Sequence, residues 1–264
     1  MLGAVLVALA TGSLALALVK APWWGWTSRD FFGLLVLALA SSLGVVVRSA
    51  RHDAPVVDLK LLESRSFNGA ILASIAYYAG FGAFLLSMVE FLTGVWHFSA
   101  IDAGLAIAPG PLMVLPFARV VAPRLSAKLG AAGRVAVIGC FVNVAAQSLW
   151  LTQIQVHAAY ATHLLPVQLL GGAGVGLTIP SLIGAGTASI PPARFGTGSG
   201  VLNMARQIGT VLGVAGLIAI LAGLNVADPV AAFRHATELV IGFFALAGLT
   251  SAALLSRRVT TSTT

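Results

Sequence analysis

Eight apolar stretches, each long enough to cross the hydrocarbon core of a bilayer, constrain this chain more than any other feature of its sequence. About 20 apolar residues form a helix that spans roughly 30 Å of hydrocarbon and satisfies its own backbone hydrogen bonds. The sequence therefore predicts an all-α membrane protein with eight transmembrane helices. The predicted spans are residues 2–19, 31–47, 67–93, 100–122, 133–152, 163–187, 199–224 and 236–256.

A polar break divides these spans into two groups. Residues 1–50 hold two short spans, and residues 67–264 hold a six-helix bundle. Residues 51–66 mix apolar and charged positions and are too short to span, so we expect them to lie in the cytoplasmic interface. The chain is apolar from Leu2 onward, which favours a span over a removable signal peptide and suggests that a longer chain precedes it.

The distribution of lysine and arginine predicts the orientation. Cytoplasmic connections of membrane proteins carry an excess of these residues. We assign one side of the membrane to Arg48, Arg51, Lys60, Arg65, Arg119, Arg124, Lys128, Arg134, Arg194, Arg257 and Arg258, and the other to Lys20, Arg29 and Arg234. We therefore expect both termini in the cytoplasm and a multi-pass location in the cell membrane, the bacterial inner membrane.

Composition and motifs exclude several classes of function. The net charge of +7 would suggest nucleic acid in a soluble protein, but the charges lie in short breaks between apolar runs, so we predict the lipid bilayer and no nucleic acid as a partner. Cys140 is the single cysteine, which rules out a disulfide within the chain. Metal-ligand spacings, phosphate-binding loops and nucleophile elbows are missing from the sequence. We predict no catalytic site, no metal site and no cofactor.

The seventh predicted span carries a polar face. At 100° per residue one narrow arc of this helix holds Ser199, Asn203, Arg206, Thr210 and Gly213. Arg206 can be interpreted in two ways. Its long stem can let the guanidinium reach back to the interface, or it can face the bundle interior, where an intramembrane charge marks a pathway or a conformational lock. Gln207 neighbours this face.

Glycine and proline predict close packing and bends. Small residues let helix backbones approach each other in a membrane, and here we expect this of Gly209 and Gly213 in the seventh span and of Gly172 and Gly176 in the sixth. Proline removes a backbone donor and bends or interrupts a helix. We expect bends at Pro109, Pro111, Pro116 and Pro180.

Glu90 is the other ionisable residue inside an apolar run, about one turn from the outer end of the third span. As a cavity carboxylate it would take up protons or attract a cation. The alternative is an interfacial residue that reaches outer water.

Four stretches together resemble the C-terminal part of the fourteen-span drug:proton antiporters of the major facilitator superfamily. They are residues 55–62 (PVVDLKLL), 103–111 (AGLAIAPGP), 194–200 (RFGTGSG) and 203–209 (NMARQIG). Residues 124–134 look like a degraded copy of the basic loop motif of that family, which here retains Arg124, Lys128, Gly130 and Arg134. Ser126 or Ala127 stands where the family has an aspartate, which puts the charge-relay role of the loop in doubt.

The resemblance implies an architecture of six N-terminal spans, two linker spans and six C-terminal spans, of which this chain holds the last eight. It also implies a small-molecule substrate, lipophilic or cationic, exported by alternating access at the expense of the proton gradient. Residues expected to line the substrate cavity or gate are Asn203, Arg206, Gln207, Thr210, Tyr77, Tyr78 and Phe81.

A different class of function stays open. The chain can be a structural or assembly module that pairs with a separate N-terminal half or with itself, because one bundle cannot rock against itself. A non-functional truncation product is a third interpretation, which the sequence does not separate from the second.

Overall fold

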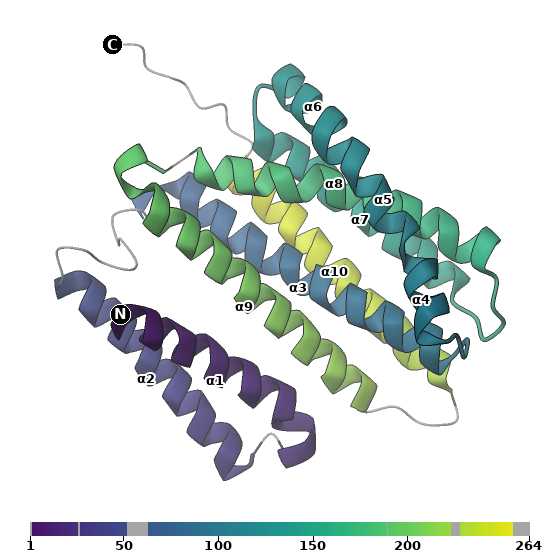
Figure 1. The fold of residues 1–264 in the computed structure, drawn as a ribbon, viewed down its shortest axis with the longest axis horizontal. Helices are drawn as coiled ribbons and strands as arrows, with labels where there is room; N and C mark the ends of the chain where they lie inside the picture. Colours follow the sequence, from purple (N-terminus) through teal and green to yellow (C-terminus); the bar gives the residue numbers. More distant parts are fainter. Residues whose placement is uncertain (1, 26, 52–62, 189, 223–227, 256–264) are drawn as a thin grey trace.

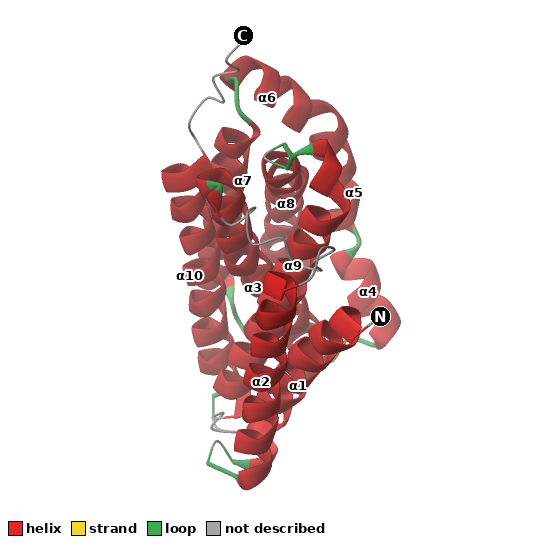
Figure 2. Cartoon of the chain, turned by 90° about the vertical axis from the view of Figure 1, so that its left-hand side faces the viewer, coloured by secondary structure: helices red, strands yellow, loops and turns green. Residues whose placement is uncertain are grey.

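A computed structural model describes residues 2–25, 27–51, 63–188, 190–222 and 228–255. Within these ranges the chain is helical and contains no strand (Figures 1 and 2). The α-helices are α1 (Leu2–Trp24), α2 (Arg29–Arg51), α3 (Arg65–Gly94), α4 (Ala100–Ile107), α5 (Pro109–Pro116), α6 (Ala122–Leu129), α7 (Ala132–Gln153), α8 (Leu165–Thr187), α9 (Phe195–Ala222) and α10 (Pro229–Leu255).

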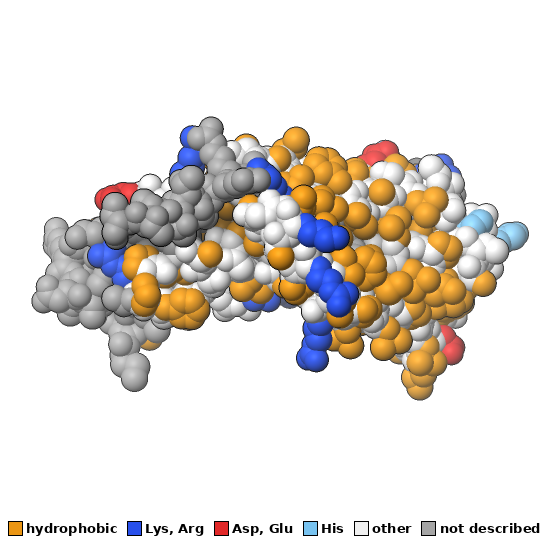
Figure 3. Space-filling model, turned by 90° about the horizontal axis from the view of Figure 1, so that it is seen from above, with side chains coloured by type: hydrophobic (Ala, Val, Ile, Leu, Met, Phe, Trp, Pro, Cys, Tyr) orange, Lys and Arg blue, Asp and Glu red, His pale blue; other side chains and the backbone are white. Residues whose placement is uncertain are grey.

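Six helical segments within the described residues are long and apolar enough to cross a membrane. They are Arg65–Gly94, Ala100–Leu129, Ala132–Gln153, Tyr160–Thr187, Phe195–Ala222 and Val230–Leu255. The last six predicted spans are therefore confirmed as candidate membrane spans, and the chain is a multi-pass membrane protein. On the face seen in Figure 3, hydrophobic side chains make up most of the surface between a group of Lys and Arg side chains and an end that carries Asp, Glu and His.

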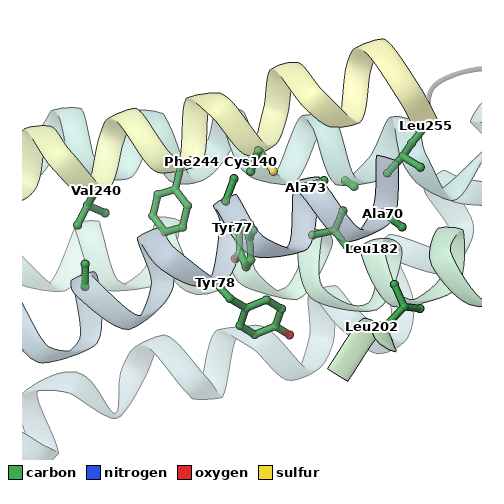
Figure 4. Packing of buried hydrophobic residues seen from close by; sticks show 14 of the residues in the cluster. Ala70, Ala73, Tyr77, Tyr78, Cys140, Leu182, Leu202, Val240, Phe244 and Leu255 are labelled. Carbon is green, nitrogen blue, oxygen red and sulfur yellow. The ribbon is translucent and has the colours of Figure 1, made fainter. Parts of the chain in front are cut away.

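Helix α3 lies at the centre of the bundle and packs against α8, α9 and α10 (Figure 1). In its most apolar stretch 67% of the residues are buried, against 17% for Ala100–Leu129, which lies at the edge. The main core gathers around Phe67, Tyr77 and Phe244 (Figure 4). A second core lies toward the Gly94 end of α3, where the Phe91 ring packs at 5.2 Å from the rings of both Trp150 and Phe233.

Proline shapes the fourth span as its chemistry predicts. Helix α4 ends at Ile107 and α5 begins at Pro109, and a π-helical turn, Phe117–Val121, follows Pro116 before α6. Pro109 and Pro111 have no N–H to donate, so the carbonyls of Leu105 and Ile107 lose their usual helical partners. Pro180 does not interrupt its helix, because α8 continues through this residue to Thr187, and a bend at Pro180 stays a prediction.

Helices α1 and α2 form an antiparallel hairpin, and α1 also packs against α9 (Figure 1). They coincide with the two predicted linker spans, but they are not among the six segments that meet the criteria for crossing a membrane. The predicted interfacial segment, residues 51–66, lies largely outside the described residues. Its last part caps α3, where Ser64 Oγ accepts a hydrogen bond of 3.3 Å from the Phe67 N–H.

Candidate functional site

Helices α3 and α9 approach closely because glycine lies at two of their contact points. A Cβ atom at Gly209 would overlap the backbone carbonyl of Ile75, and one at Gly213 would overlap the carbonyl of Ala79. No side chain larger than hydrogen fits either position without movement of a backbone. The structure thus places both predicted packing glycines between α9 and the central helix, and this contact fixes where the polar face of α9 points.

A pocket of about 180 Å³ lies along this helix pair. We call it the α3–α9 pocket. Its lining residues are Tyr78, Phe81, Gly82 and Leu85 of α3 and Asn203, Arg206, Gln207 and Thr210 of α9. Six of the seven residues predicted to line the cavity therefore lie around one pocket. Asn203 and Gln207 are exposed at its surface, whereas Arg206 and Thr210 are half-buried.

Arg206 is held by an aromatic ring. Its guanidinium carbon lies 4.7 Å from the centroid of the Tyr78 ring, in range for a cation–π interaction. Arg206 Nε is buried and has no hydrogen-bond partner among the described residues. The backbone carbonyl of Arg206 accepts a hydrogen bond of 3.0 Å from Thr210 Oγ1. The α3–α9 pocket therefore presents polar groups and a positive charge whose hydrogen bonds are incompletely satisfied.

Tyr77 lies elsewhere, contrary to its prediction as a cavity residue. Its side chain is fully buried in the core, with the Phe244 ring centroid at 5.2 Å, and its hydroxyl accepts a hydrogen bond of 3.2 Å from Asn143 Nδ2 on α7. Neighbouring residues of a helix differ by 100° in direction, so the Tyr78 ring leaves α3 in another direction, although it is also buried and belongs to the same core (Figure 4). Tyr77 joins α3 to α7 and α10, and Tyr78 faces α9.

A second pocket, of about 300 Å³, lies between α3, α8 and the α4–α5 segment. We call it the α3–α5–α8 pocket. It is lined by Phe81, Phe84, Leu85, Ile107, Gly110, Pro111, Val114, Gln168, Gly171, Gly172, Val175 and Ile179. Phe81 and Leu85 line both pockets, so the two lie side by side along α3.

The two predicted packing glycines of α8 lie at close helix contacts, and Gly172 also lines this second pocket. A Cβ atom at Gly172 would overlap the carbonyl of Gly110, and one at Gly176 would come within 2.7 Å of Phe117 Cβ. The close contact at Gly172 holds α5 against α8 beside the pocket.

Sequence reasoning missed Gln168. Only 3% of its surface is exposed, it lines the α3–α5–α8 pocket, and its amide nitrogen has no hydrogen-bond partner among the described residues. An amide inside an apolar span was a visible signal, because polar side chains are rare and costly there.

The other predicted sites lie away from both pockets. Glu90 is exposed near the end of α3. Arg124 and Lys128 are exposed on α6, and Gly130 ends that helix with a left-handed backbone (φ +70°) that favours glycine. Arg134 Nη1 donates a hydrogen bond of 2.9 Å to the Leu129 carbonyl, across the turn. In the described structure the residues retained from the loop motif thus lie on α6, at its C-terminal end and in the first turn of α7.

The fold and the two pockets define a class: a multi-pass helical membrane protein whose central helix borders two adjoining pockets, one with polar and one with mostly apolar lining. Such concave sites between the helices of a bundle are typical places for ligand binding.

Comparison with known proteins identifies transporters of this class as relatives. No family model matches the chain. It is 27% identical over 77% of its length to the puromycin resistance protein pur8 of Streptomyces alboniger and 29% identical over 83% to the multidrug resistance protein Stp of Mycobacterium tuberculosis. It is also 26% identical over 80% of its length to YhcA of Bacillus subtilis, an uncharacterized MFS-type transporter.

These relatives confirm the resemblance to drug transporters of the major facilitator superfamily. Their names refer to drug resistance or transport and none to an enzymatic activity. The matches cover 40% of pur8, 40% of Stp and 39% of YhcA, so the chain spans about two fifths of the length of these relatives.

Proposed function

We propose that this chain is the C-terminal portion of a drug efflux transporter that exports lipophilic or cationic small molecules by alternating access, driven by the proton gradient. In this proposal α1 and α2 are two linker spans and residues 67–264 are the C-terminal transporter bundle. A six-span N-terminal half completes the substrate path, and both termini of this chain are cytoplasmic in a bacterial inner membrane.

The polar face of α9 is the observation that carries the proposal. Asn203 and Gln207 are exposed on an apolar helix, with Arg206 half-buried beside them. Hydrocarbon would impose a cost of several kcal/mol on such groups, since they would lose their hydrogen bonds to water. A water-filled path between two bundles removes that cost, because water and substrate can bind the same groups.

Proton coupling is expected to depend on the proposed N-terminal half. Neither pocket is lined by a carboxylate among the described residues. Glu90 remains the candidate proton or cation site of this chain, but it lies outside both pocket linings. We therefore expect the N-terminal half to supply the main proton-binding carboxylate.

Drug accumulation in a hypersensitive bacterium tests the function. Cells would express this chain alone, or together with the part of pur8 that lies outside the matched region. Efflux of preloaded puromycin or ethidium would be followed after energisation. We expect efflux only from the combined chains and its loss when a protonophore collapses the gradient. Efflux that is no faster than in cells with an empty vector, despite both chains being present in the membrane, would contradict the proposal.

A second candidate is an assembly module without transport activity of its own. As such a module the chain would pair with a separate half or with itself. Crosslinking in native membranes separates this candidate from the first: a stable partner without drug efflux supports the module, whereas a strictly monomeric chain excludes it.

A further inference from the structure

The α3–α5–α8 pocket contains one polar side chain, Gln168, in an otherwise apolar lining. This side chain is 97% buried, and its amide nitrogen has no partner among the described residues. Aromatic rings of Phe81 and Phe84 line the pocket together with aliphatic Val114 and Val175. Its volume of about 300 Å³ lies at the small end of the range for small-molecule sites.

An unsatisfied amide in such surroundings needs an explanation. A buried polar group without a hydrogen bond costs roughly 1–3 kcal/mol, and this cost is largest where the surroundings are apolar. Leucine at this position would fill similar space without the cost. The amide is thus explained by a group that enters the pocket and forms the missing hydrogen bond.

We propose that the α3–α5–α8 pocket is a binding subsite for uncharged, ring-containing compounds, and that Gln168 orients them through a carbonyl or hydroxyl group. This inference rests on the proposed function, because it treats the pocket as part of the drug path. Ring faces pack against Phe81 and Phe84, while the amide of Gln168 selects compounds that carry a hydrogen-bonding oxygen. Gln168 acts here as a specificity-determining residue.

The lining of this pocket does not favour charged ligands. No charged side chain is among its lining residues, so an ion would lose its hydration without compensation. Arg206 lines the adjoining α3–α9 pocket, which shares Phe81 and Leu85 with this one. Its positive charge repels a cation at short range. Lipophilic cations are therefore expected to bind elsewhere in the complete transporter.

Photolabelling with benzophenone tests the subsite directly. Benzophenone is an uncharged two-ring ketone that inserts into nearby C–H bonds on irradiation. The purified chain would be irradiated with it in lipid nanodiscs, and labelled peptides would be mapped by mass spectrometry. We expect concentration-dependent, saturable labelling on α3, α5 and α8. Diphenylmethane, which lacks the carbonyl, should compete with this labelling more weakly than unlabelled ketones of the same shape do.

Three variants separate specific binding from partition into lipid. Gln168→Leu should weaken apparent affinity about fivefold through loss of one hydrogen bond. Val114→Phe, which fills the pocket, should abolish saturable labelling. Leu112→Phe is the matched control on the same helix, because its side chain is 68% exposed, and it should label like the original chain.

The inference would be overturned if labelling were spread evenly over exposed apolar residues, or if it were unchanged in Gln168→Leu and Val114→Phe. The amide of Gln168 would then be satisfied only by water. The readout requires neither a gradient nor transport. Drug efflux without saturable pocket labelling would refute this subsite alone, whereas labelling without efflux would refute the transport function and leave a binding pocket.

Discussion

Substitution of Gly213 by alanine tests the helix contact that positions the α3–α9 pocket. The added methyl group would overlap the carbonyl of Ala79 on α3, and overpacking of this kind costs about 1–3 kcal/mol of unfolding free energy. Alanine recovers up to about 1 kcal/mol because it favours helix more than glycine does. The expected net loss is about 1 kcal/mol, or a fall of roughly 2–4 °C in melting temperature for a chain of this size.

Gly200 provides the matched control on the same helix. A Cβ atom there meets nothing within 4 Å, so Gly200→Ala should gain up to about 1 kcal/mol from helix propensity alone. The single cysteine, Cys140, is fully buried, so a thiol-reactive fluorophore reports unfolding in detergent. A Gly213→Ala variant that melts at or above the temperature of Gly200→Ala would refute close packing at this contact.

Three further predictions concern neighbouring features. Tyr77→Phe should lower the unfolding free energy by about 1 kcal/mol by loss of a hydrogen bond and leave drug export unchanged. Tyr78→Leu, in contrast, should keep the fold and weaken export. Melting and transport assays on both variants would show the difference. Asn203→Cys should react with a water-soluble maleimide in membranes while buried Cys140 does not; equal reactivity would contradict the exposure of the polar face. Gly130→Ala should cost about 1–2 kcal/mol, because the left-handed backbone disfavours a side chain; unchanged melting would contradict this.

Periodicity predicted the helices well because hydrocarbon leaves few alternatives for the backbone. The last six spans overlap those expected, although Ala100–Leu129 ends later and Val230–Leu255 begins earlier than predicted. Helix α9 carries Asn203, Arg206 and Thr210 around one pocket as its polar arc indicated. The described helices at the predicted linker spans, α1 and α2, also agree in position. These features depend on the helical repeat alone.

Features that depend on neighbouring helices could not be predicted in this way. Tyr77 and Tyr78 are the same residue type in adjacent positions and both are buried, and only the packing of α7, α9 and α10 around α3 decides which of them lines the α3–α9 pocket. Pro180 leaves α8 continuous, whereas Pro109 coincides with the break between α4 and α5. An amide at Gln168 is visible in the sequence, but the apolar pocket that it lines forms only when α5 and α8 pack against α3.

Drug export by the complete transporter with Asn203→Ala and Arg206→Ala is the most direct test of the proposed substrate path along α9. Leu212→Ala, an exposed apolar position on the same helix, is the control. If the polar face of α9 binds substrate, the double variant should reach the membrane in normal amounts and lose at least about 90% of initial efflux, since two or more hydrogen bonds of roughly 1 kcal/mol each are lost. Efflux equal to that of the Leu212→Ala control would contradict this role of α9.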